Sequence, residues 1–278
     1  GDNVIAVKVD NSDQPNSRWY SGCGIYRHVW LTKAQKMAYI PQWGQYVSTT
    51  PQGDVKVKVD YLAHGSKMKL SIRNTVYDAD GKVVAKSLGN KVQQLKVKNP
   101  QLWDIAKGYL YTVKSELVVN GKVMDTATTT TGFREVKFDT QKGFFLNGRN
   151  IKINGVCEHH DFGCLGAAVN EDAMHRKLTI LRDMGVNAIR SSHNPPAPEL
   201  LNMCDSMGIL VMDESFDMWR RKKSNGDYAR FFDEWHKRDL SDLIKRDRNH
   251  PSIIMWSIGN EVLEQWSDAA ADTLSLEQ

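Results

Sequence analysis

Residues 186–214 read VNAIRSSHNPPAPELLNMCDSMGILVMDE and contain a predicted helix between two short apolar runs. The runs at 186–189 and 209–212 have the length and composition of buried strands. Residues 198–207 carry apolar side chains at helical spacing, begin with a proline and are followed directly by Gly208. This order of strand, helix and strand predicts two parallel strands joined by a covering helix.

The same alternation continues on both sides of this stretch. Further strands are predicted at 151–156 and 253–258, and further helices at 170–184, with Asn170 as N-cap, and at 231–248. Four such units without a dinucleotide-binding glycine fingerprint favour the first half of an eight-stranded βα barrel. A doubly wound open sheet is the alternative.

Before residue 136 the apolar residues recur with a period of two, which indicates strands. Asp80-Gly81 and Asn120-Gly121 stand between such runs, where hairpin turns need residues that tolerate positive φ. About seven short strands in this region predict an immunoglobulin-like sandwich over residues 35–134. Residues 1–34 resemble the last strands of a separate β-domain.

Composition excludes several classes of protein. Of 278 residues, 41% are hydrophobic and 25% charged, which argues against a disordered, collagenous or coiled-coil chain. No run of eighteen apolar residues occurs, so we expect no membrane span. The net charge is +4, but lysines alternate with valines at 55–59 as on the solvated face of a strand, so no nucleic-acid partner is expected. The four cysteines are irregularly spaced and imply no disulfide framework.

Each predicted strand of the C-terminal part ends in polar side chains, where the function of a βα barrel collects. These strand ends are Cys157-Glu158-His159-His160-Asp161, Arg190-Ser191-Ser192-His193-Asn194, Asp213-Glu214 and Asn260-Glu261. Helix N-caps favour Asp, Ser and Asn, but they do not explain the paired histidines after the first strand. The pattern favours a polar pocket for a hydroxyl-rich ligand.

Other interpretations of these and neighbouring residues are less demanding. Two cysteines and two histidines could suggest zinc, but their spacing matches no standard structural site, and no metal is expected: Cys157, His159, His160 and Cys164. The basic run at 220–223 is interpreted as a solvated loop. Trp19 and Trp103 are interpreted as core or domain-seam aromatics.

Glu261 is the hardest residue to explain structurally. It follows a buried strand and a glycine and lies near Trp256, where a carboxylate without a task would be costly. Partly apolar surroundings raise the proton affinity of a carboxylate, which suits a general acid. Asn260 supplies an amide that can donate to a sugar hydroxyl. Glycoside hydrolysis needs two carboxyl groups, about 5–5.5 Å apart for retention, and Glu261 can be one of them.

At these residues the chain resembles glycoside hydrolase family 2, and most closely the bacterial β-galactosidases of that family. The resemblance covers nearly the whole chain. The matching motifs are GIYRHVWL at 24–31, NPQLW at 99–103, GFR at 132–134, NG at 147–148, INGV at 153–156, RSSHNP at 190–195, DE at 213–214 and NHPSIIMWSIGNE at 249–261. The last motif is highly specific.

The resemblance implies a retaining exo-β-glycosidase acting on terminal β-D-galactosides. Glu261 would be the acid/base and Asn260 would hold the sugar 2-hydroxyl, while His159 and His193 would bind hydroxyls near the scissile bond. Asp161 matches an acidic position in some members only, and Glu214 follows the family pattern as a pocket residue. In domain terms the resemblance implies the end of a jelly-roll sugar-binding domain (1–34), an immunoglobulin-like domain (35–134) and the first half of a TIM barrel (135–278).

The sequence departs from the family in two respects. Residues 216–219 read FDMW where some galactosidases have a magnesium-binding Glu and His, so no cofactor is expected here, although relatives can hold a divalent cation. The family nucleophile is a Glu on strand seven, so we expect it outside this chain, which resembles a truncated piece and should be inactive alone.

Several questions stay open on the sequence. A β-glucuronidase, a β-mannosidase or a non-catalytic carbohydrate-binding protein is the alternative function. A carbohydrate is the expected partner, homo-oligomerisation is open, and a periplasmic or secreted location is favoured over the cytoplasm.

Overall fold

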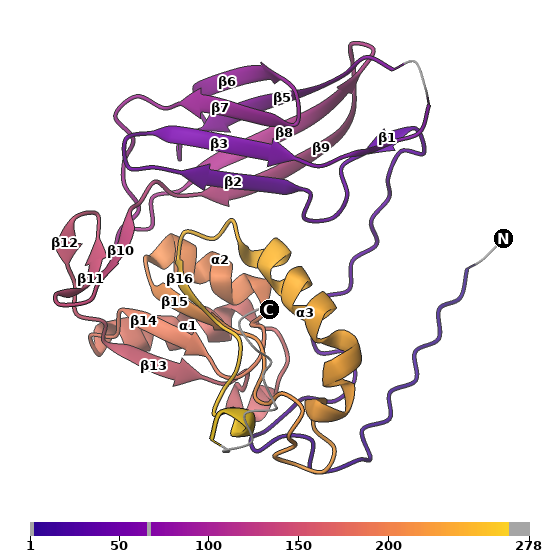
Figure 1. Cartoon of the computed structure of the whole chain (residues 1–278), viewed down its shortest axis with the longest axis vertical. Coiled ribbons are helices and arrows are strands. Elements are labelled where there is room, and N and C mark those ends of the chain that lie inside the picture. Colours follow the sequence, from indigo (N-terminus) through magenta and orange to yellow (C-terminus); the bar gives the residue numbers. More distant parts are fainter. Residues whose placement is uncertain (1–2, 66–67, 267–278) are drawn as a thin grey trace.

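The computed structural model describes residues 3–65 and 68–266, which form a β-sandwich above a parallel sheet that is covered by helices (Figure 1). All strand pairs of the sandwich are antiparallel, and all pairs in the helix-covered sheet are parallel. The two halves correspond to the change of periodicity in the sequence near residue 136.

The sandwich consists of a four-stranded sheet in the order β6-β5-β8-β9 and a three-stranded sheet in the order β2-β3-β7, with a short β1-β4 pair beside them. Its strands are β1 (Ala38–Tyr39), β2 (Gln45–Thr49), β3 (Asp54–Val59), β4 (Leu62–Ala63), β5 (Leu70–Tyr77), β6 (Val83–Gly89), β7 (Val92–Lys96), β8 (Tyr111–Val119) and β9 (Lys122–Thr131). The predicted antiparallel sandwich is therefore present.

The core of the sandwich follows from the period of two. In β3 the valines at 55, 57 and 59 are buried while the residues between them are exposed. They pack against Ile72 and Val76 of β5 and Val113 and Leu117 of β8, so that the two sheets enclose one core. Asn120 and Gly121 both have positive φ in the predicted turn between β8 and β9.

A small sheet that the sequence analysis did not anticipate follows the sandwich. It comprises β10 (Val136–Asp139), β11 (Gly143–Leu146) and β12 (Arg149–Asn150) in sequential antiparallel order. Phe144 and Leu146 of β11 pack with Trp103, Ala188 and Leu210 in one apolar cluster. The small sheet therefore connects the sandwich to the parallel sheet.

The parallel sheet has the order β13 (Gly155–Glu158), β14 (Ala188–Ser191), β15 (Leu210–Glu214) and β16 (Ile253–Ser257). Spatial order equals sequence order, as in a barrel, whereas a doubly wound sheet reverses its direction at a switch point. The first strand was predicted at 151–156 but begins at Gly155. Pairing starts there because the backbone N–H of Asn154 donates to the Asn187 side chain instead of to a strand (2.8 Å).

Three helices flank the sheet, α1 (Glu171–Asp183), α2 (Pro198–Met207) and α3 (Phe232–Asp247). Asn170 caps α1 as predicted, because its side chain accepts the Ala173 N–H. Leu178 of α1 and Leu201 of α2 are fully buried against Ile189 and Val211 of the sheet. None of the helices in the described ranges has the length and apolar composition needed to cross a bilayer.

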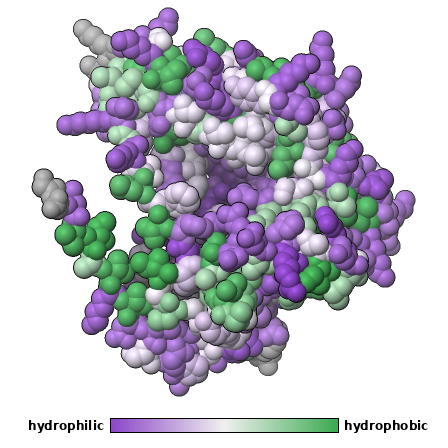
Figure 2. All heavy atoms as spheres, turned by 180° about the vertical axis from the view of Figure 1, so that it is seen from behind, coloured by the Kyte–Doolittle hydropathy of each residue, from purple (hydrophilic) through white to green (hydrophobic). Residues whose placement is uncertain are grey.

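The N-terminal stretch differs from expectation. Residues 3–37 contain no strand, although strands were predicted up to residue 34. A strand needs a neighbour that accepts its hydrogen bonds, and no described strand pairs with this stretch. Its first apolar residues extend away from the body, with Val4 and Ile5 89% and 87% exposed (Figure 2). Residues 16–27 instead contact the loops that follow the strands of the parallel sheet, for example through Arg18 to Asp217 and Arg27 to the Pro195 carbonyl.

Trp103 marks the contact between the sandwich and the helical part, as its interpretation as a domain-seam aromatic predicts. It is fully buried, and its indole N–H donates to the Asp205 carbonyl in α2 (2.7 Å). Gly132 packs directly on it: a Cβ at this glycine would lie 2.7 Å from Trp103 Cβ and 3.0 Å from Pro251 Cβ. The contact therefore requires a glycine.

We predict that Gly132→Ala lowers the stability of the intact protein by about 1–3 kcal/mol, because the added methyl group overpacks this contact. Gly89→Ala is the matched control, since a Cβ there meets only the Gln93 side chain, at 3.5 Å. Denaturant unfolding of both variants checks the prediction. Equal midpoints for the two variants would show that the seam can accommodate the methyl group.

Candidate active site

The carboxyl ends of the four parallel strands meet at one edge of the sheet. His159 follows β13, His193 lies just after β14, Glu214 ends β15, and Glu261 follows β16. The prediction that these four residues share one end of the sheet is confirmed. They do not line a single open depression, however, because Glu214 is fully buried.

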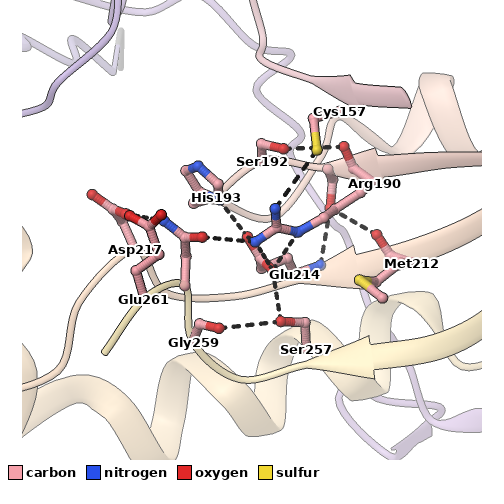
Figure 3. Close-up of polar contacts among 12 residues, drawn as sticks. Cys157, Arg190, Ser192, His193, Met212, Glu214, Asp217, Ser257, Gly259 and Glu261 are labelled. Carbon is pink, nitrogen blue, oxygen red and sulfur yellow. Dashed lines mark hydrogen bonds and ion pairs between the residues drawn. The ribbon is translucent and has the colours of Figure 1, made fainter. Parts of the chain in front are cut away.

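Glu214 accepts hydrogen bonds on both carboxylate oxygens (Figure 3). Arg190 donates from Nε to Oε2 (2.8 Å) and from Nη2 to Oε1 (2.9 Å). His193 Nδ1 lies 2.6 Å from Oε1, and Ser257 Oγ donates to Oε2 at 2.6 Å. Burial raises the pKa of Glu214, but the bonds from His193, Ser257 and Arg190 outweigh it, so the net pKa lies below the ordinary value. Glu214 was expected to contact substrate, whereas in the structure it orients its neighbours.

Asn260 is the second fixed group of the site. Its Oδ1 accepts a hydrogen bond from Arg190 Nη2 and its Nδ2 donates to Asp217 Oδ1, both at 2.8 Å. These partners define which end of the amide is oxygen and which is nitrogen. The predicted residues Asn260 and Glu214 are thus linked through Arg190, and His193 joins them through Glu214.

Asp217 carries a buried negative charge between two cations. Arg18 Nη2 lies 2.8 Å from its Oδ1, and Lys223 Nζ lies 3.1 Å from the same atom. Lys223 also donates to the Asn260 carbonyl (2.6 Å). Burial raises the pKa of Asp217, but Asn260, Arg18 and Lys223 lower it more, so the net pKa lies below its ordinary value.

The interpretation of 220–223 as a solvated loop is wrong for Lys223, whose side chain is only 6% exposed. The buried ammonium group of Lys223 compensates the buried charge of Asp217, since an unpaired buried carboxylate would be costly. Asp217 lies three residues beyond the end of β15. It could have been predicted from the sequence if the polar residues that follow each strand had been included over a few more positions. Arg18 is remote in sequence and follows no local pattern.

Glu261 stands apart from the buried network. Its side chain is 57% exposed and Arg18 Nη1 is 3.5 Å from its Oε2. The apolar surroundings expected for this carboxylate are not found among the described residues, and Trp256 is itself 37% exposed. Glu261 has a φ of +44°, a left-handed conformation in the segment that turns away from β16. The carboxylate is consequently accessible at this edge.

The two predicted histidines form an aromatic group with Trp19. The Trp19 ring stacks on His159, with centroids 4.7 Å apart, and meets His193 edge-on at 5.2 Å. His159 Nδ1 lies 2.8 Å from the Ser192 carbonyl, which holds the ring in place. Trp19 therefore lies at the seam between the N-terminal stretch and the parallel-sheet part, in agreement with its interpretation, and also contacts two candidate site residues.

Asp161 is not joined to these residues. Its Oδ1 accepts the backbone N–H of Gly163 (2.8 Å), and its carbonyl accepts from Lys177, so its bonds serve its own loop. Within the described residues, no group of three potential ligands lies close enough to hold a metal ion. His160 Nε2 instead contacts the Ala167 carbonyl (2.8 Å).

Asp213 lies beneath the network, next to Glu214. It is fully buried, and its Oδ1 accepts from Ser191 Oγ at 3.3 Å. Asp247 of α3, also fully buried, is held by Arg246 through two bonds of 2.6 Å. Burial and the neighbouring carboxylate of Asp247 raise the pKa of Asp213 to about 8. In the folded protein the Asp213 carboxyl therefore keeps its proton to a higher pH than an exposed aspartate does.

Comparison with known families assigns both halves of the chain. Residues 38–134 match glycosyl hydrolases family 2, and residues 136–275 match the TIM barrel domain of that family. The parallel sheet and its helices therefore correspond to part of a TIM barrel.

Individual relatives agree with this assignment. The chain is 57% identical to β-galactosidase BoGH2A of Bacteroides ovatus, over 99% of this chain and 34% of that protein. It is 43% identical to a putative β-glucuronidase of Formosa agariphila, over 94% of this chain and 26% of the relative. A solved β-glycosidase from Bacteroides vulgatus superposes with a TM-score of 0.86 at 39% identity, covering 91% of this chain and 34% of the other. The chain thus spans about a third or less of the length of these relatives.

We predict that Asp213→Asn stabilises the intact protein relative to wild type, and that this difference in stability grows as the pH rises from 4 to 8. In the unfolded chain this carboxyl ionises near its ordinary pKa of about 4, whereas in the folded protein it keeps its proton up to about pH 8. Wild-type stability therefore falls through this window, by at most about 1.4 kcal/mol per pH unit, and the amide removes that loss. Melting temperatures of both proteins at pH 4 to 8 measure it.

Asp233→Asn is the control, because Asp233 has a 71% exposed side chain. It should follow the wild-type profile. A constant difference between Asp213→Asn and wild type across the pH range would contradict the prediction.

Proposed function

The chain belongs to glycosyl hydrolase family 2, and we propose that the protein containing it is a retaining exo-β-glycosidase that hydrolyses terminal β-D-galactosides through a glycosyl-enzyme intermediate. The observation that carries this proposal is the exposed Glu261 carboxylate next to a buried, hydrogen-bonded network at the carboxyl edge of the sheet. The high identity to a protein named β-galactosidase supports the choice of sugar.

Glu261 acts as the acid/base in this proposal. In the first step its carboxyl gives a proton to the glycosidic oxygen as the bond to the aglycone breaks. In the second step the same carboxylate takes a proton from water, which attacks the anomeric carbon and releases the sugar. Arg18, 3.5 Å away, helps to orient the carboxylate.

The histidines bind the sugar from fixed positions. The Nδ1 atoms of His159 and His193 face the Ser192 carbonyl and the Glu214 carboxylate, both of which only accept, so each Nδ1 carries the proton. In the neutral ring Nε2 is then left to accept a hydrogen bond from a sugar hydroxyl. Asn260 is held beside them by Arg190 and Asp217, and we assign it to the 2-hydroxyl.

The nucleophile is expected outside this chain. It must be a second carboxylate on the other face of the sugar. Glu214 does not fit that role, because it is fully buried and both oxygens accept hydrogen bonds from Arg190, His193 and Ser257. Residues 1–278 alone should therefore not turn over a glycoside.

A neutral sugar suits this edge better than a uronate, the sugar of the β-glucuronidase alternative. The cations here are already paired, Arg190 with Glu214, and Arg18 and Lys223 with Asp217. A sugar carboxylate would have to displace one of these partners. β-Mannosides and binding without catalysis remain outcomes of the test below.

The proposal includes the finer architecture and the absence of a required cofactor. We assign residues 1–34 to the end of a jelly-roll sugar-binding domain and residues 135–278 to the first half of the catalytic barrel. The alternating apolar residues of the N-terminal stretch are exposed here, whereas in a complete β-domain they would be buried against neighbouring strands. This supports the first assignment. The mechanism uses carboxyl chemistry alone and requires no metal ion.

The intact protein should hydrolyse p-nitrophenyl β-galactoside in preference to the corresponding glucuronide and mannoside, and the first product should be the β-anomer. Glu261→Gln should lower kcat by about 10²–10⁴-fold, because the amide cannot transfer the proton. Steady-state kinetics on the three glycosides and proton NMR of the product measure both.

Glu135→Gln makes the same chemical change at an exposed residue that follows the sandwich, and should leave kcat unchanged. Preference for the glucuronide would assign the alternative substrate. Sugar binding without turnover by the wild-type protein would make it a binding protein.

A further inference from the structure

Asn249, at the start of the family motif and before the amino end of β16, contacts the sandwich through its side chain. β2 is an edge strand of its sheet, so one side of its backbone has no neighbouring strand. The Val47 N–H donates to Asn249 Oδ1 (2.9 Å), and Asn249 Nδ2 donates to the Gln45 carbonyl (3.0 Å). The carboxamide thus takes the place of a peptide group of a neighbouring strand. Only an amide side chain offers both a donor and an acceptor in this geometry.

The segment around Asn249 is held from two further sides. Arg248 Nη2 donates to the Trp43 carbonyl in the sandwich (2.9 Å). Asp205 of α2 accepts the backbone N–H of Ser252 at 3.0 Å and lies 2.6 Å from His250 Nδ1. Burial lowers the pKa of His250, but Asp205 raises it by more, so a charged pair is favoured. The turn that precedes β16 is therefore fixed by the sandwich and by α2 together.

β16 needs such an anchor because its pairing with β15 is irregular. Val211 pairs with Ile253, but Met212 pairs with Met255, which leaves one extra residue on β16. A bulge of this kind changes the direction of a strand and weakens the ladder locally. Beyond the bulge the regular pairs from Met212 to Glu214 hold the strand, together with the bond from Ser257 to Glu214. Before the bulge the backbone is held by the turn that Asn249 anchors to β2.

We propose that Asn249 is a positioning residue for the acid/base: by pairing with the edge of β2 it fixes the register of β16 and so the height of Glu261 at the glycosidic oxygen. This inference rests on the proposed function. It gives the sandwich, which contributes no group to the reaction itself, a defined part in placing the proton donor. A displacement of about 1 Å can cost on the order of 10²-fold in rate.

The chemistry of the leaving group provides a selective test. A phenyl β-galactoside needs protonation of its leaving oxygen, whereas a dinitrophenyl β-galactoside departs without it. In the intact protein, Asn249→Ala should lower kcat/KM about 10–100-fold for the phenyl galactoside and less than about 3-fold for the dinitrophenyl galactoside. Loss of general stability would lower both to the same extent.

Asn249→Asp keeps the size of the side chain and the acceptor for Val47 N–H but loses the donor to the Gln45 carbonyl. It should show the same selectivity with a smaller loss, and it keeps the test valid if Asn249→Ala does not fold. Asn90→Ala, in the turn between β6 and β7 of the same sandwich, is the matched control and should change neither rate.

Equal losses on both galactosides, or no loss on either, would overturn the inference while leaving the proposed function intact. If wild-type protein hydrolyses neither galactoside, the proposed function fails and this inference fails with it.

Discussion

The buried carboxylate of Glu214 is the interaction on which the arrangement of the active-site edge depends. A charge with no exposure to water is costly unless donors surround it. Glu214 obtains those donors from Arg190 in the second strand of the sheet, from His193 just after that strand, and from Ser257 of the fourth. Because breaking any of these bonds would leave a buried charge poorly compensated, three strand ends are held in one relative position.

The need to compensate buried charge also determines the positions of residues around Glu214. Arg190 is oriented by Glu214 and in turn fixes the amide oxygen of Asn260, whose nitrogen reaches Asp217. Asp217 then attracts Arg18 and Lys223 from segments that belong to no strand. Charges are therefore balanced below the surface, and Glu261 is left exposed at the surface. In the proposed mechanism Glu261 would act from a rigid support, in agreement with the requirement that catalytic groups be preorganised.

Much of the fold and the centre of the site could be predicted from the sequence, since the residues concerned lie on regular elements. Alternating valines in β3 and the helix before Gly208 reflect burial patterns that depend only on local periodicity. Position at a strand end was enough to find His193, Glu214 and Asn260. Arg18, Trp19 and Lys223 could not be found in this way, because they reach the site from loops and their place depends on charge and ring contacts formed only in the folded chain. The sequence does not predict the burial of Glu214 or the exposure of Glu261, because both depend on contacts with residues that are distant in the chain.

In the proposed mechanism Glu214 organises the site and does not react with the sugar. Inactivation of the intact protein with a 2-deoxy-2-fluoro-β-galactoside that carries a good leaving group should trap the glycosyl ester on the nucleophile. Peptide mapping by mass spectrometry then identifies the labelled carboxylate. The account predicts a label on a glutamate outside residues 1–278, with the peptide that contains Glu214 unmodified. A glycosyl ester on Glu214 would contradict it.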